Sequence, residues 1–281
     1  MSLELSFLRE TSIILMSNFK KYSLRIVKYI LIAAFWLLIW EICAILLNVP
    51  VLFPEPLDVI KRLLELAITK GFIFSSFASI LRVFSGMLIG IVIGIILAIF
   101  CTFFKFAYDI FYPLLTIIKA TPIASFVLVI WIFLGDQKTP VIITVLMMLP
   151  IVWTNLYEGI KCVDKDLIEV CKSYKLSKFK AFKAVYFPSV IPYFVSSLVS
   201  GIGLSWKAGI AAEVLCSPKW SIGEAIFNAK YYFNGVDLFA WTVSVIVLSL
   251  IFELLITRLI KYMFRKYIVS TRGKYGNQKS M

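Results

Sequence analysis

Residues 80–103 read ILRVFSGMLIGIVIGIILAIFCTF, and Arg82 is the one charged residue in this stretch. An α-helix rises about 1.5 Å per residue, so about 20 apolar residues cross the roughly 30 Å hydrocarbon core of a bilayer. The stretch Ile80–Phe103 therefore predicts a helix that spans a membrane.

Five further stretches have the composition and length of membrane spans. They are Tyr29–Leu47, Leu114–Leu134, Val141–Tyr157, Ile191–Ala212 and Leu238–Ile260. Prolines interrupt three of them: Thr121-Pro122 breaks the third span near its start, Pro150 lies in the fourth, and Pro188 and Pro192 open the fifth. The sequence thus predicts an all-α membrane protein with six transmembrane helices.

The composition of the whole chain supports this class. Of its 281 residues, 61% are hydrophobic and 16% are charged, whereas soluble domains average about 45–50% and about 25%. A soluble enzyme, a secreted module and a nucleic-acid-binding protein are therefore excluded. We expect one membrane domain over residues 29–262, with a basic N-terminal segment (1–28) and a basic tail (263–281).

The distribution of positive charge predicts the orientation. With both termini inside, 21 of the 29 Lys and Arg residues fall in Met1–Lys28, near Lys105 and Lys119, in Glu158–Tyr186 and from Arg258 onward. Short loops rich in Lys and Arg stay in the cytoplasm. The net charge of +13 then reflects topology rather than binding to nucleic acid. We expect a multi-pass protein of the cell (inner) membrane, anchored by its first span, with both termini cytoplasmic.

The chain lacks the residues that most catalytic sites need. It has 0 histidines, and its five cysteines form no C-x-x-C pair. No G-x-x-x-x-G-K-[ST] stretch is present, so the chain does not itself cradle a nucleotide. The sequence predicts a non-catalytic membrane subunit without a cofactor or metal of its own.

Small residues mark one face of the second span. Gly86, Gly90 and Gly94 form a doubled G-x-x-x-G pattern, which allows another helix to approach closely. The alternative is that these glycines are merely of the kind common in any membrane helix.

The two-helix loop, residues 159–186, is far longer than a turn. Asp164 or Asp166 can cap its first helix, with Glu169 completing a capping pair. Ser177 can cap a second helix that runs through Val185 and is closed by Pro188. A short amphipathic helix in the cytosol buries its apolar face against a partner, here plausibly a groove on a soluble protein. The alternative is a basic loop lying on anionic lipid.

Several motifs in and around this loop carry a family resemblance. Glu169-Val170-Cys171, Lys175-Leu176-Ser177 and Phe187-Pro188 with Pro192 resemble the "EAA" loop of binding-protein-dependent ABC importer permeases. Other segments resemble the nitrate/sulfonate/taurine-type subgroup. They are Pro54-Glu55-Pro56, Leu81–Gly86, Lys119–Ala124 and Trp206 with Ala211-Ala212-Glu213.

The resemblance implies a type I ABC importer permease fold and a set of partners. We expect a homodimer, two ATP-binding cassette subunits that bind the ATP, an external substrate-binding protein and membrane lipid, but no nucleic acid. The loop would be the coupling helix that docks on the ATPase, with Leu167, Cys171 and Tyr174 as its buried contacts. The full predicted coupling set is Asp164, Leu167, Ile168, Glu169, Val170, Cys171, Tyr174, Lys175, Leu176 and Ser177. Lys175 replaces the family's glycine, so we expect a different bend there, since a side chain disfavours positive φ.

Charged and small residues in the spans suggest a pathway for the solute. The candidates are Lys207, Trp206, Glu213, Pro122 and Ser200. Lys207 could attract an anionic solute. Its alternatives are an ion pair with Glu213 or Glu253, or a side chain that reaches the interface. For Glu41 and Arg82 we expect a structural pair at the external end.

Two other transporter classes remain as alternatives. An ion-driven secondary transporter would need no coupling loop, and a membrane scaffold of another ABC-type vitamin uptake system would lack the external motifs. The solute is left open among nitrate, sulfonate, taurine and similar small molecules.

Overall fold

The computed structural model describes residues 27–265, and these residues form helices without a β-strand. The predicted all-α class is confirmed. Most of the expected basic N-terminal segment and basic tail, residues 1–26 and 266–281, lie outside the described residues.

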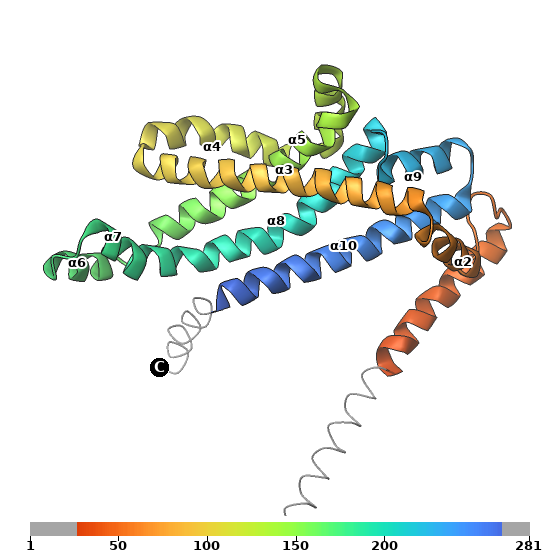
Figure 1. Cartoon of the computed structure of the whole chain (residues 1–281), viewed down its shortest axis with the longest axis horizontal. Helices are drawn as coiled ribbons and strands as arrows, with labels where there is room; N and C mark the ends of the chain where they lie inside the picture. Colours follow the sequence, from red (N-terminus) through yellow and green to blue (C-terminus); the bar gives the residue numbers. More distant parts are fainter. Residues whose placement is uncertain (1–26, 266–281) are drawn as a thin grey trace, which may run out of the picture.

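The described helices follow one another with short connections (Figure 1). They are an N-terminal helix Val27–Leu47, α2 Pro56–Ala67, α3 Lys70–Phe103, α4 Lys105–Ala120, α5 Ile123–Lys161, α6 Lys165–Ser173, α7 Lys178–Ala181, a π-helical turn η1 Phe182–Tyr186, α8 Phe187–Cys216, α9 Ile222–Tyr231 and α10 Gly235–Met263.

Five of these helices, rather than the six predicted, are long and apolar enough to cross a membrane: the N-terminal helix, α3, α5, α10 and the continuous helix Lys178–Cys216. The third predicted span is divided, because α4 ends where Thr121 takes an extended backbone before Pro122. Its remainder forms the first arm of α5. At Gly135, with a φ of 75°, the chain folds back, and Val127 packs in one cluster with Ile143. The long arm after Gly135 contains the fourth predicted span.

The long arm of α5 lies between α3 and α8 at very short range. A Cβ placed on Gly86 would lie 2.7 Å from the Thr144 Cβ, and one on Gly90 would lie 2.8 Å from the Met148 Cβ. Gly94 stands equally close to Val152. Dispersion contacts made at such short range hold helices together where lipid offers no hydrophobic driving force. The glycine pattern of α3 thus faces α5.

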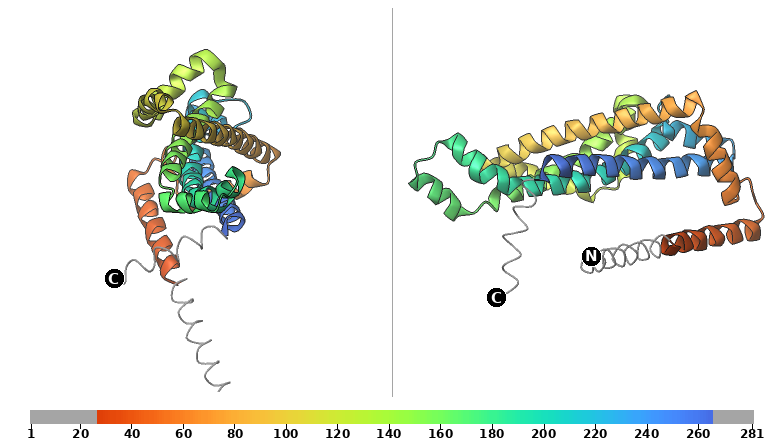
Figure 2. Two further views of the ribbon diagram at one scale, coloured as in Figure 1. Left: turned by 90° about the vertical axis from the view of Figure 1, so that its left-hand side faces the viewer. Right: turned by 60° about the horizontal axis from the view of Figure 1, so that its bottom comes forward.

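The two ends of the bundle carry different elements (Figures 1 and 2). α6 and α7 project at the loop end, whereas α2 and α9 lie at the opposite end. At that end, an Arg62–Asp237 ion pair of 2.5 Å ties α2 to α10. The pKa of Arg62 is raised because its guanidinium donates hydrogen bonds to Asp237 and Glu65.

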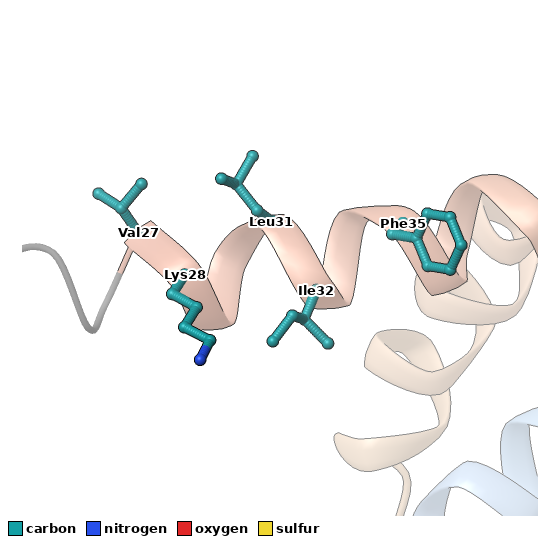
Figure 3. A pocket seen from close by; sticks show the side chains of 5 residues that line it. All are labelled: Val27, Lys28, Leu31, Ile32 and Phe35. Carbon is teal, nitrogen blue, oxygen red and sulfur yellow. The ribbon is translucent and has the colours of Figure 1, made fainter.

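The N-terminal helix is packed against the bundle only near its end. Trp40 Nε1 donates to the Pro54 carbonyl over 3.1 Å, and Ala44 is buried. Toward its start, a hollow of about 410 Å³ is lined by residues of this one helix, as Figure 3 shows. Val27, Leu31 and Phe35 there are exposed, which suits a helix that faces lipid.

Candidate functional site

The first helix of the two-helix loop begins at a defined cap. The Asp164 side chain accepts a hydrogen bond of 2.9 Å from the Asp166 amide, so Asp164, of the two candidates, is the N-cap of α6. Such a cap satisfies an amide that the helix leaves without a partner. The loop therefore has a helix start encoded locally in the sequence.

The bend after α6 is made by Lys175, which adopts a φ of 50°. The Leu176 amide donates to the Cys171 carbonyl over 3.0 Å, and the Lys175 amide donates to the Lys172 carbonyl over 2.9 Å. These two bonds form the helix-ending motif that usually has glycine at the left-handed position. The expectation of a different bend at Lys175 is wrong, because the lysine takes the left-handed conformation at a cost of about 1–2 kcal/mol.

The second helix of the loop does not end at Pro188, contrary to the sequence prediction. Ser177 caps α7, and the chain continues through η1 directly into α8. The Phe187 amide bonds to the Phe182 carbonyl five residues back, so the helix is widened just before the proline. Pro188 thus lies inside the continuous helix Lys178–Cys216, directly after this widened turn.

The apolar residues of the loop divide into an inner and an outer set. Cys171 is buried with Val163 and Val185, and Leu167 and Ile168 pack on this cluster. Cys171 thus lies in the loop's own core with Leu167 and Ile168 half-buried against it, and the contact of these three residues with a partner stays a prediction.

The outer set is left uncovered. Its apolar side chains are Val170, Tyr174, Leu176 and Phe179, with Tyr174 77% and Phe179 74% exposed. The polar members of the predicted set, Asp164, Glu169, Lys175 and Ser177, are exposed beside them. We call Val170, Tyr174, Leu176 and Phe179 the outer face of the loop.

Near the opposite end, a buried polar network joins three helices. Glu213 of α8 is 0% exposed and accepts hydrogen bonds from Arg82 of α3 over 2.5 Å and from Ser79 over 2.6 Å. The Ser79 hydroxyl oxygen in turn accepts the Ile222 amide at the start of α9 over 3.0 Å. A buried charge is tolerated when it is paired and hydrogen-bonded in this way.

The network differs from the pairings considered from the sequence. Arg82 pairs with Glu213 rather than with Glu41, and Glu213 pairs with Arg82 rather than with Lys207. Ser79 was not singled out as a site residue. Arg82 and Glu213 are 131 residues apart, so no local pattern signals their contact. The LRVFSG and AAE segments that carry the family resemblance are those that supply this pair.

Of the four remaining pathway candidates, only Ser200 and Lys207 lie on the same surface. Trp206 is buried, with its ring 5.2 Å from that of Phe252 in α10, whereas Pro122 is exposed at the start of α5. Ser200 and Lys207 are both exposed on α8, and their spacing of two turns places them on the same face. Among the described residues Lys207 has no ion pair.

The described residues thus form a bundle of helices long and apolar enough to cross a membrane, with a capped two-helix loop at one end. The chain belongs to the family of binding-protein-dependent transport system inner membrane components, whose model matches residues 90–268. The predicted family is thereby confirmed.

Individual relatives place it in the expected subgroup. The chain is 28% identical over 243 residues to the nitrate import permease protein NrtB of Synechocystis, covering 82% of this chain and 84% of the relative. It is 22% identical to the taurine transport system permease protein TauC of Escherichia coli, over 76% of this chain and 80% of the relative. A bicarbonate transport system permease protein of Synechococcus elongatus is 26% identical over 57% of this chain and 58% of the relative.

Proposed function

We propose that this chain is the permease subunit of an ATP-driven importer of a small anionic solute, and that its two-helix loop docks on a separate ATPase. The observation that supports docking most directly is the outer face of the loop. The loop has a filled core of its own, yet it exposes Tyr174 and Phe179. An apolar face on a short, capped helix is the kind of surface that a groove on a partner covers.

The contact residues follow from burial rather than from the motif. Tyr174 and Phe179 are large, exposed and close to the bend at Lys175. Aromatic side chains of this kind contribute most of the binding energy in many interfaces. Glu169 is exposed on α6 next to Val170, where it can meet a cation of the partner. We therefore propose Val170, Tyr174, Leu176 and Phe179, with Glu169, as the docking surface.

The orientation and the partners complete the proposal. The Lys and Arg bias supports a cytoplasmic position for the two-helix loop and both termini, and α2 and α9 would then face an external substrate-binding protein. Two copies of this chain would form the translocation pathway, and the ATP would be bound by the two ATPase subunits. ATP binding would then move the loop as a rigid body and switch the accessible side.

The face of α8 with Ser200 and Lys207 is the proposed lining of the pathway. Lys207 is an exposed cation in the middle of an apolar helix, where it can attract an anion. The relatives are named for nitrate, taurine and bicarbonate, which all carry a negatively charged oxygen group. Trp206 and Glu213, which are buried in packing and in the Arg82 pair, would support this helix rather than touch the solute.

Co-purification tests the docking proposal. We expect Tyr174→Ala with Phe179→Ala to weaken retention of the ATPase by about 30-fold, as for the loss of an interface hot spot. The matched control removes two exposed aromatic side chains at the opposite end, Phe227→Ala with Tyr231→Ala. If both double variants retain the ATPase equally well and unfold at the same temperature, the docking surface is wrong.

A further inference from the structure

A cavity of about 780 Å³ lies at the loop end of the bundle, inside the angle between the membrane helices and the two-helix loop. Its volume falls within the range of about 300–1,000 Å³ that is usual for small-ligand sites. Most of its wall is apolar and comes from α3, α5 and α8, with Ile95, Ile99, Leu156, Val190, Ile191 and Phe194 among the lining residues.

The cavity follows the helix axes. On one helix the lining residues run from Phe182 to Phe194, which at about 1.5 Å per residue is roughly 18 Å. One leaflet of a bilayer contributes half of the hydrocarbon core, or about 15 Å. The apolar wall is therefore long enough for an acyl chain of a single leaflet.

The end of the cavity nearest the loop is basic. Lys161, Lys165 and Lys178 all line it, and no Asp or Glu is among its lining residues in the described part of the chain. The Lys161 ammonium lies 4.4 Å from the ring centroid of Tyr157 and 5.4 Å from that of Tyr108, neither of which lines the cavity, so Lys165 and Lys178 supply the free charge of this rim. Basic pockets between membrane helices on the cytoplasmic side bind the head groups of anionic lipids.

The π-helical turn forms part of this wall. Phe182 and Tyr186, the first and last residues of η1, both line the cavity. A π turn widens a helix by one residue and is found frequently at functional sites. The irregular turn thus lies where the apolar wall meets the basic rim.

We propose that this cavity binds an anionic phospholipid, with one acyl chain along α8 and the phosphate at Lys165 and Lys178. The inference rests on the proposed function in one respect, since that function places the loop end at the cytoplasmic leaflet. Because the lining residues come from α3, α5, α8, both parts of the two-helix loop and Phe264 at the end of α10, the bound lipid joins the loop to the bundle.

Native mass spectrometry of the purified full-length chain tests the proposal. Phosphatidylglycerol and phosphatidylcholine with identical acyl chains are added separately, and retained lipid is counted. We expect the wild type to retain phosphatidylglycerol in preference to phosphatidylcholine. In the variant Lys165→Gln with Lys178→Gln, retention of phosphatidylglycerol should be weakened about fivefold for each lysine removed. The matched control, Lys219→Gln with Lys230→Gln, removes the same charge outside the cavity lining and leaves retention unchanged.

A second variant tests the apolar part of the site. Ile99→Trp fills the cavity and should abolish retention of phosphatidylglycerol. The variant Lys165→Gln with Lys178→Gln tests the rim at exposed positions, where substitution does not threaten folding. Equal retention of the two lipids by the wild type, or undiminished retention by both variants, overturns the site. Equal retention of oleate assigns the cavity to a free fatty acid and overturns the phospholipid. ATPase co-purification is scored separately, so loss of docking with intact lipid retention rejects the proposed function alone.

Discussion

The two ends of the bundle differ in how far their charged side chains are paired with one another within the chain. At the opposite end, Arg82 and Glu213 neutralise each other and Arg62 is bonded to Asp237. At the loop end, Tyr174 and Phe179 are left uncovered, and no ion pair forms there among the described residues. Exposed aromatic side chains such as Tyr231 also occur at the opposite end, so the two ends differ in the pairing of their charges.

This contrast assigns different roles to charges that look alike in the sequence. Glu213 is an intramembrane carboxylate, which by default suggests a functional site. Its partners Arg82 and Ser79 show that it holds α3, α8 and the start of α9 together. Lys207, by contrast, is exposed on α8. Between these two candidates the proposed pathway role therefore falls to Lys207.

The largest effect is expected from breaking the buried pair. Glu213→Ala leaves Arg82 without its partner, and removal of one member of a buried pair costs about 3–5 kcal/mol. We expect a strongly lowered unfolding temperature in detergent and an unchanged affinity of the folded fraction for the ATPase. The double variant Arg82→Met with Glu213→Leu should lose less than Glu213→Ala, because no charge is left unpaired.

A second carboxylate supplies the control for that experiment. Glu253 lies in α10, half-buried near Gly203, and has no ion pair among the described residues. Glu253→Ala should change the unfolding temperature little. If Glu253→Ala and Glu213→Ala destabilise the protein equally, the Arg82 pair is not what stabilises the opposite end.

A smaller effect is expected between the two ends, where α5 connects them. Gly90→Val places a side chain against Met148, and overpacking of this kind costs about 1–3 kcal/mol. Thermal unfolding in detergent measures it, with Gly71→Val as the control because a Cβ at Gly71 meets no atom within 4 Å. An equal response of the two variants would show that close contact between α3 and α5 is not required.

Local signals in the sequence predicted most of the helices. The span at Ile80–Phe103, the break at Thr121-Pro122 and the cap at Ser177 depend on neighbouring residues, and the structure contains each of them. The fold-back at Gly135 was not predicted. It brings Val127 onto Ile143, and tertiary packing rather than hydropathy decides that contact.

The candidate site was predicted less completely than the fold. The position of the two-helix loop follows from charge, length and motif, but the motif does not tell which apolar side chains face inward. Leu167 and Cys171 share helical spacing with Tyr174, and only the packing of Val163 and Val185 separates the inner from the outer set. The Arg82–Glu213 pair likewise requires the three-dimensional fold.

The smallest expected effect is a gain in stability at the loop end. Lys175 adopts a positive φ, which costs a non-glycine residue about 1–2 kcal/mol. Glycine avoids this cost but has greater conformational freedom in the unfolded chain, so Lys175→Gly should stabilise the bend by about 1 kcal/mol. Hydrogen exchange of the Leu176 amide, which bonds to the Cys171 carbonyl, measures this locally. Lys172→Gly is the control, because it lies inside α6 and should speed exchange. Slower exchange in Lys175→Gly with unchanged ATPase retention would show that the bend tolerates the lysine and that docking does not use it. Weakened ATPase retention would instead place Lys175 in the interface.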